Sequence, residues 1–314
     1  MNHKTILPFI VLALASMACR IQSTSPTPII PVAPPSTNTP LPPVPTDTSV
    51  WPASSGLTLS ILKNGTYYAP VYDRTITLVN GYYSNGSAAD PYSVQMLDMV
   101  AFGDLNGDGA VDAAFILVEN GGGSGQFESV VAVLDSGGAP TQAGQAQLGD
   151  RVRINSMTIT SGTIALDMLV QGPNDPMCCP SLPETQTYRM MGNTFWMTSL
   201  TTRTPDNHER ALTISSPVYG AAVTNPFTIS GNVTIAPFEN MLAYRIYLPD
   251  GTKINESPLM VDSDGIAGGP GTFSQAFDLS NAGITGPVII QFLDLSAADG
   301  TTMAMGSVVL TVHQ

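Results

Sequence analysis

The side chains with the clearest chemical potential lie at alternate positions of one glycine-rich segment. Positions one, three, five, seven and nine of this segment are Asp104, Asn106, Asp108, Ala110 and Asp112. Calcium prefers six or more oxygen ligands at about 2.3–2.6 Å, and a tightly turned loop directs alternate residues, with one backbone carbonyl, to a single centre. The spacing therefore predicts a calcium-binding loop. The competing interpretation is a polar hairpin that uses the Asn-Gly and Asp-Gly pairs only as turns.

The residues around this loop indicate which kind of loop it is. The segment resembles the start of an EF-hand or dockerin loop, but position twelve is Phe115 rather than an acid. It is more similar to the calcium loop of FG-GAP repeats in integrin-type propellers, where a hydrophobic strand follows the ninth-position Asp, as 113–118 does here. That resemblance implies a structural calcium ion between two strands. Propellers repeat this unit, and one good copy occurs here, so a propeller is not implied.

Cys178 and Cys179 form the second distinctive pair, within the segment Asp175–Pro180. Adjacent thiols outside the cytoplasm can form a vicinal disulfide, although neighbouring Cα atoms lie at most about 3.8 Å apart and ordinary disulfides prefer about 5.5–6 Å. A reduced, buried pair is the alternative. Metal binding is the weakest interpretation, since no second Cys pair or His cluster accompanies these residues. We interpret the pair as a structural turn closed by a disulfide.

Catalytic groups are sparse in the sequence. His208 lies in a polar linker and His313 beside the C-terminus, and neither is placed like a general base. The Gly121–Gly125 run lacks the residues of a phosphate-binding loop and reads as a hairpin loop. We therefore expect a non-catalytic binding or scaffolding protein. The alternative is a glycoside or cell-wall hydrolase with a carboxylate pair in the first domain, because such pairs come from separate strands.

The composition excludes one class of partner. The chain has 11 Lys and Arg against 24 Asp and Glu, which gives a net charge of −13. Nucleic acids and anionic lipid headgroups bind basic patches, so neither is an expected direct partner. With 29 Gly and 26 Pro, and few of the Lys and Glu residues that surface helices favour, the chain is predicted to be mainly β.

The N-terminus has the layout of a bacterial export signal. Lys4 supplies a basic start, 6–15 an apolar run and 16–18 a small-residue cleavage site. Cys19 follows directly and resembles the acylated Cys of a bacterial lipoprotein lipobox, although Ser16 stands where that family prefers Leu. The predicted arrangement is a signal peptide at 1–18 and a lipid anchor at Cys19. The alternative is ordinary cleavage and a secreted protein.

Residues 19–52 are rich in Pro, Thr and Ser and cannot bury enough apolar surface to fold, so they are predicted to be a disordered tether. Such spacers are similar to those of bacterial lipoproteins, where they hold a folded head away from the membrane. The expected location is extracytoplasmic and lipid-anchored. The expected partners are the membrane, through the anchor, and a cell-wall polymer or an envelope protein.

Residues 53–205 are predicted to form an antiparallel β-rich domain, with short strands between Asn-Gly and Gly-Gly turns. A single helix around Pro91–Leu97 is the exception we expect. The predicted strands are Thr58–Leu62, Thr75–Val79, Met96–Phe102, Ala113–Glu119, Phe127–Leu134, Val152–Ile159, Ile164–Val170 and Thr185–Met191.

Residues 206–314 show about seven short alternating strands, which is typical of an immunoglobulin-like β-sandwich. The opening 215–231, with its Ser-Pro and Asn-Pro-Phe-Thr-Ile-Ser-Gly segments, and the Ser296–Gly300 hairpin closely resemble the immunoglobulin-like domain of bacterial spore germination proteins. The resemblance implies a non-enzymatic extracytoplasmic module without catalytic residues, usually appended to other domains of surface lipoproteins.

Overall fold

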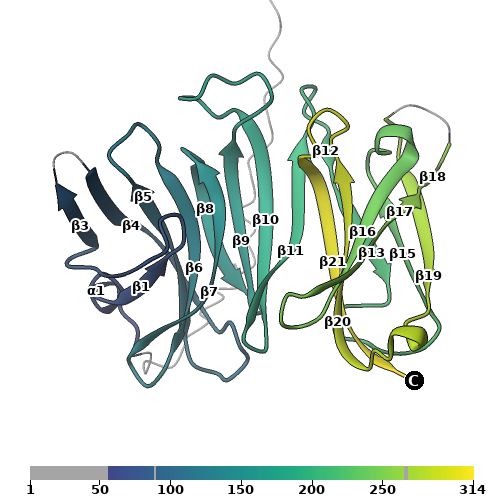
Figure 1. Cartoon of the computed structure of the whole chain (residues 1–314), viewed down its shortest axis with the longest axis horizontal. Helices are drawn as coiled ribbons and strands as arrows, with labels where there is room; N and C mark the ends of the chain where they lie inside the picture. The colour runs from purple at the N-terminus through teal and green to yellow at the C-terminus, as the bar shows by residue number, and fades with distance from the viewer. Residues whose placement is uncertain (1–55, 88–89, 265–267) are drawn as a thin grey trace, which may run out of the picture. The chain divides into compact units, whose positions relative to one another are not determined.

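Antiparallel strands make up almost all of the regular structure (Figure 1), which confirms the prediction of a mainly β protein. The computed structural model describes residues 56–87, 90–264 and 268–314. The predicted signal peptide, Cys19 and the tether lie outside the described residues. We call residues 56–205 the first region and residues 206–314 the second region.

The first region is built on a five-stranded antiparallel meander, in the order β3-β4-β5-β6-β7. Its strands are β3 (Tyr82–Ser87), β4 (Asp90–Gly103), β5 (Asp112–Asn120), β6 (Phe127–Asp135) and β7 (Pro140–Asp150). Both faces of this sheet are covered, so β5 is buried along nearly its whole length. A strand covered on both faces needs an apolar run rather than strict alternation, as in Ala113–Val118.

One face of the meander packs against the helical turn α1 (Leu59–Leu62) and the hairpin of β1 (Thr66–Ala69) and β2 (Arg74–Thr77). Tyr67 meets Phe115 edge-on in this core, with ring centroids 4.9 Å apart. The other face packs against four further strands through a second apolar core. These strands are β8 (Arg153–Thr160), β9 (Thr163–Val170), β10 (Leu182–Met191) and β11 (Thr194–Arg203).

The same four strands continue into the second region, because β11 pairs with β21 through Ser199–Gly306 and its neighbours. The resulting ten-stranded sheet has the main order β17-β16-β20-β21-β11-β10-β9-β8. Its remaining strands are β12 (Glu209–Arg210), β14 (Ala222–Thr224), β16 (Met241–Tyr247), β17 (Lys253–Met260), β20 (Gly286–Leu295) and β21 (Thr302–His313).

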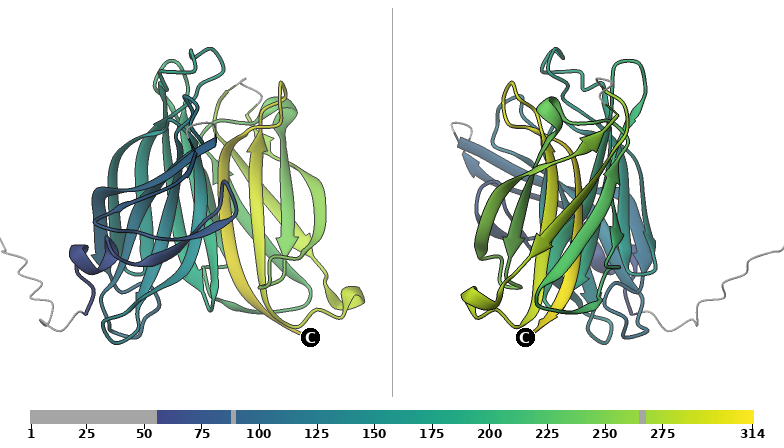
Figure 2. Two further views of the ribbon diagram at one scale, coloured as in Figure 1. Left: turned by 60° about the vertical axis from the view of Figure 1, so that its left-hand side comes forward. Right: turned by 90° about the vertical axis from the view of Figure 1, so that its right-hand side faces the viewer.

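The second region is a two-sheet sandwich (Figure 2), in which the β17-β16-β20-β21 end of the large sheet faces a four-stranded sheet. The strands of that smaller sheet are β13 (Leu212–Ser216), β15 (Phe227–Val233), β18 (Asp262–Ser263) and β19 (Gly271–Phe277). Two 3-10 turns, η1 (Phe238–Asn240) and η2 (Ser280–Ala282), connect strands. Apolar residues on one face of β19, such as Phe273 and Phe277, point into the core, as the alternation predicted.

Two local predictions in the first region were wrong. The predicted strand Thr58–Leu62 is the helical turn α1, because the Thr58 side chain caps it by accepting a hydrogen bond from the Ile61 N–H at 3.3 Å. The predicted helix at Pro91–Leu97 belongs to β4. Its buried residues, Tyr92, Val94 and Met96, recur with a period of two, which is the period of a strand and not of a helix.

No helix in the described ranges is both long enough and apolar enough to cross a membrane.

Candidate functional site

The predicted calcium loop connects β4 to β5, and its oxygen-bearing side chains turn back onto the loop itself. The Asp104 carboxylate accepts hydrogen bonds from the N–H of Gly107 at 2.6 Å and of Gly109 at 3.0 Å. Both glycines have positive φ, 83° and 86°, and this lets the chain curl around Asp104. Asp108 Oδ1 accepts from the Ala110 N–H at 2.7 Å, which lowers the pKa of Asp108.

Asn106 completes the exposed part of the loop. Its Oδ1 accepts from the Asp108 N–H at 3.0 Å, and its Nδ2 donates to Asp108 Oδ2 at 2.8 Å. Asp104, Asn106 and Asp108 therefore lie together on one loop, as their spacing predicted. Their oxygens are hard ligands of the type that calcium prefers.

Asp112 is placed differently from the other predicted ligands. It is fully buried at the start of β5. Its Oδ2 accepts from the Leu105 N–H at 2.8 Å and its Oδ1 from the Asp135 N–H at 2.9 Å, so this carboxylate ties the loop to the end of β6. Desolvation raises the pKa of Asp112 despite these two hydrogen bonds.

The fit of this loop to a metal ion is thus partial. Asp104, Asn106 and Asp108 lie toward the surface of the loop, whereas Asp112 is fully buried. Asp104 and Asp112 each already accept from two backbone N–H groups, so a cation would have to share their oxygens. Across residues 56–87, 90–264 and 268–314, no three His, Cys, Asp or Glu side chains are grouped so that they could hold a metal ion.

Cys178 and Cys179 lie in the loop between β9 and β10, where the structure joins them in a disulfide with Cα atoms 3.8 Å apart. Asp175 organises the same loop: its Oδ2 accepts from the backbone N–H of Gly172 at 2.8 Å and of Ser181 at 2.7 Å. The Ser181 hydroxyl also donates to Asp175 Oδ1 at 2.7 Å, and this bond is the main reason that the pKa of Asp175 is lowered. The pair thus sits in a turn that Asp175 holds.

Sequence reasoning missed a buried acid in the first region, Glu119. Its side chain is fully buried on β5 and accepts from the N–H of Val71 at 3.0 Å and of Tyr72 at 3.3 Å. The Tyr92 hydroxyl donates to the same carboxylate at 3.0 Å. Burial and the nearby carboxylate raise the pKa of Tyr92. Glu119 therefore pins the turn between β1 and β2 onto the meander.

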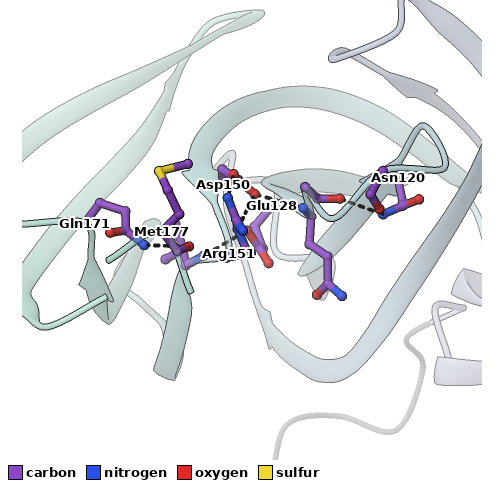
Figure 3. A network of polar contacts seen from close by, with 10 residues as sticks. Asn120, Glu128, Asp150, Arg151, Gln171 and Met177 are labelled. Atoms are coloured by element: carbon purple, nitrogen blue, oxygen red, sulfur yellow. Dashed lines mark hydrogen bonds and ion pairs between the residues drawn. The ribbon is translucent and has the colours of Figure 1, made fainter. Parts of the chain in front are cut away.

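Two further glutamates have pKa values raised to about 7 by burial, Glu128 on β6 and Glu184 on β10. Glu128 accepts from the Val152 N–H at 3.0 Å, and Figure 3 shows it beside the Asp150–Arg151 ion pair. Glu184 accepts from Gln186 Nε2 at 2.5 Å. A pKa near 7 is a property of general acids in glycosidases, but here burial is its main cause, with a contribution from the Asp150 carboxylate at Glu128.

Figure 3 also shows how the predicted glycine loop is held. Asn120, at the end of β5, donates from Nδ2 to the carbonyls of Gly123 at 3.1 Å and Gly125 at 2.6 Å. Its Oδ1 accepts from the Gly122 N–H at 2.7 Å. The run Gly121–Gly125 is therefore a tied hairpin loop between β5 and β6, as predicted.

Two cavities lie beside the β20–β21 hairpin, and both have Arg210, Ser296 and Met303 in their walls. One, of about 750 Å³, is lined mainly by the β9–β10 loop, the end of β11 and the hairpin. The other, of about 730 Å³, is lined by the turn η1 and the hairpin. Arg210 Nη1 donates to Asp294 Oδ2 at 2.8 Å between them. Sequence reasoning could not find this pair, because its members are 84 residues apart.

Comparison with known proteins identifies one part of the chain. Residues 211–301 match the family model of the immunoglobulin-like domain of bacterial spore germination. The match covers most of the second region and confirms the resemblance found in the sequence. No curated protein matches the chain. The second region thus contains an immunoglobulin-like domain of the spore germination family.

Proposed function

We propose that the chain is a lipid-anchored, non-catalytic protein of the bacterial cell envelope, which binds or scaffolds a cell-wall polymer or another envelope protein. Support for the anchor comes from the export signal and Cys19 in the sequence. Support for an extracytoplasmic module comes from the family of residues 211–301.

The observation that carries the non-catalytic part is the use of the buried acids in the first region. Asp112 and Glu119 each direct both carboxylate oxygens to backbone N–H groups. A catalytic carboxylate must instead present an oxygen to its substrate. These acids are suited to holding loops in place on the meander and not to acid–base chemistry.

Calcium belongs to this proposal as a structural ion in the β4–β5 loop. Asp104, Asn106 and Asp108 and the Ala110 carbonyl would contribute oxygens, and Asp112 would join by sharing its own. The ion would add a positive charge to a loop that carries three carboxylates and would hold β4 against β5. The proposed role is therefore stability of the loop and not chemistry.

One observation favours the rival hydrolase, namely the pKa values of about 7 of Glu128 and Glu184. A hydrolase would shorten a cell-wall polymer, whereas a binding protein would leave it intact. Incubation of the full chain with purified cell-wall sacculi separates the two functions. We expect the protein to sediment with the sacculi and to release no soluble fragments.

The anchor is tested by expressing the full chain in a bacterial host and fractionating the cells. We expect the protein in the membrane fraction, with a mass that includes acyl chains on Cys19, and we expect the Cys19→Ala variant to be soluble. An unmodified N-terminus at Cys19 in the wild-type protein would contradict the anchor and leave the secreted form.

A further inference from the structure

The cavity beside η1 contains a buried acid whose hydrogen bonding is incomplete. Asp294 lies in its wall with 2% of its side chain exposed. Its Oδ2 accepts from Arg210, but its Oδ1 is buried and has no hydrogen-bond partner among the residues that the structure describes. A buried carboxylate oxygen without a partner is costly, so this position favours an occupant that donates a hydrogen bond.

The same cavity carries an exposed aromatic ring. Phe238, on η1, lines the cavity and is 64% exposed, so packing does not explain its presence. The turn that presents it is well held: the Asn240 N–H donates to the Pro237 carbonyl at 3.0 Å, and the Asn240 carbonyl accepts from the Val261 N–H at 2.8 Å. The Ser263 hydroxyl adds a bond to Asn240 Oδ1 at 3.1 Å. Phe238 is therefore a surface ring on a fixed turn.

Charge narrows the class of ligand further. Among the described residues that line the cavity, two are acids, Glu239 and Asp294, and one is a cation, Arg210. This balance disfavours an anionic ligand, because burying a further negative charge beside Asp294 costs free energy. The ligand should be uncharged, able both to donate and to accept hydrogen bonds, and apolar on one face.

A pyranose ring has these three properties. Its C–H face can pack on an aromatic ring, and each hydroxyl both donates and accepts. We propose that this cavity binds an uncharged saccharide, which stacks on Phe238, donates a hydroxyl hydrogen bond to Asp294 Oδ1 and accepts one from Arg210. The inference rests on the proposed binding function and names the ligand class and the site.

Calorimetric titration with uncharged tetrasaccharides of N-acetylglucosamine, glucose and mannose tests the proposal on the full chain. We expect at least one of them to bind with a dissociation constant of about 1 mM or tighter. The variant Phe238→Ala should weaken that binding at least about tenfold, as loss of an aromatic contact at the centre of a site does. Phe102→Ala, an exposed phenylalanine on β4 far from η1 in sequence, is the matched control and should bind like the wild type.

Asp294→Asn gives a second readout, because it replaces an acceptor by a donor where the hydroxyl is expected to donate. Binding should weaken at least about tenfold if the variant is folded by circular dichroism. If Asp294→Asn is not folded, the Phe238→Ala variant still tests the site, because that ring is exposed and its loss leaves the core intact.

Two results would overturn the site: no binding by any of the tetrasaccharides, which would leave water as the partner of Asp294, or equal affinity for the wild type and Phe238→Ala. Sedimentation with sacculi separates this failure from failure of the proposed function. If the wild type and Phe238→Ala sediment equally, the protein binds sacculi through a surface other than this cavity. If the wild type stays in solution, both the saccharide site and the proposed binding function are wrong.

Discussion

The two regions bury their acidic side chains in different ways. Among the residues that the structure describes, the first region has three buried acids, Asp112, Glu119 and Glu128, and each accepts hydrogen bonds from the backbone of another segment. The second region has one, Asp294, which keeps an oxygen without a partner at the wall of a cavity. The carboxylates of the first region are therefore engaged by backbone donors, whereas the one in the second region keeps an unmet hydrogen bond.

The difference shows that burial of an acid is a poor guide to function until its partners are known. Asp112 is the most buried of the predicted ligands, and both of its carboxylate oxygens accept from backbone N–H groups. Asp294 is buried to a similar extent, but its hydrogen-bond partner among the described residues is the Arg210 guanidinium, which reaches one of its two oxygens. A binding site is indicated by the unmet hydrogen bond and the exposed ring beside it.

The largest expected effect on stability comes from removing a buried carboxylate of the first region. Asp112→Ala removes the acceptor of two buried N–H groups and should lower the free energy of unfolding by about 2–4 kcal/mol. Asp108→Ala, on the exposed part of the same loop, should cost about 0.5 kcal/mol. Urea unfolding without calcium measures both, and equal losses would show that Asp112 does not tie the loop to β6.

The next effect concerns pH. Burial raises the pKa of Glu128 from its ordinary value of 4.5, which applies to the unfolded chain, to about 7 in the folded protein. Between these two values the folded state therefore binds more protons than the unfolded state. The free energy of unfolding should therefore fall as pH rises from about 4.5 to 7, by on the order of 1–3 kcal/mol, and then level off.

Glu128→Gln should remove this part of the pH dependence and should gain stability relative to the wild type as pH rises. The exposed Glu239→Gln is the control and should keep the wild-type profile. Urea midpoints at a series of pH values give the answer. A Glu128→Gln profile parallel to that of the wild type would show that Glu128 is not buried as described.

Calcium should have a smaller effect. If the β4–β5 loop binds calcium, an ion concentration about ten times the dissociation constant adds about 1.4 kcal/mol to the free energy of unfolding. The melting temperature should rise by a few degrees, and the double variant Asp104→Asn/Asp108→Asn should lose the shift. Scanning calorimetry with calcium and with a chelator measures this, and identical melting temperatures would remove the metal from the proposal.

Phe238→Ala should have the smallest effect on stability, about 0.5 kcal/mol or less, because most of its ring is exposed. The same change is expected to have a large effect on binding. Urea unfolding checks the first expectation, and a loss near that of Asp112→Ala would mean that the ring supports the fold and not a ligand.

Sequence patterns predicted the strands whose burial follows a simple rule. β5 is an apolar run and lies where we expected it, and β15 shows the alternation predicted for the second region. The strands β7 and β11 were missed because they are only half-buried and polar residues interrupt their pattern. β7 forms because it pairs with β6, and β11 forms because it pairs with β10 and β21. Local sequence patterns do not reveal such pairing.

The candidate site was less predictable for the same reason. The loop spacing correctly brought Asp104, Asn106 and Asp108 together, since all three lie within one turn. The role of Asp112 depends on the N–H of Asp135, 23 residues later. The pairing of Arg210 with Asp294, and the cavity that they share with Phe238, arise only when the sandwich closes.

We propose that this protein holds a saccharide without cleaving it. The most direct measurement is to incubate the wild-type protein with the tetrasaccharide that it binds, release the bound fraction and determine its mass. We expect an intact tetrasaccharide from the wild type and almost no bound fraction with Phe238→Ala. Shortened fragments that accumulate with time would contradict it and would make the protein a hydrolase.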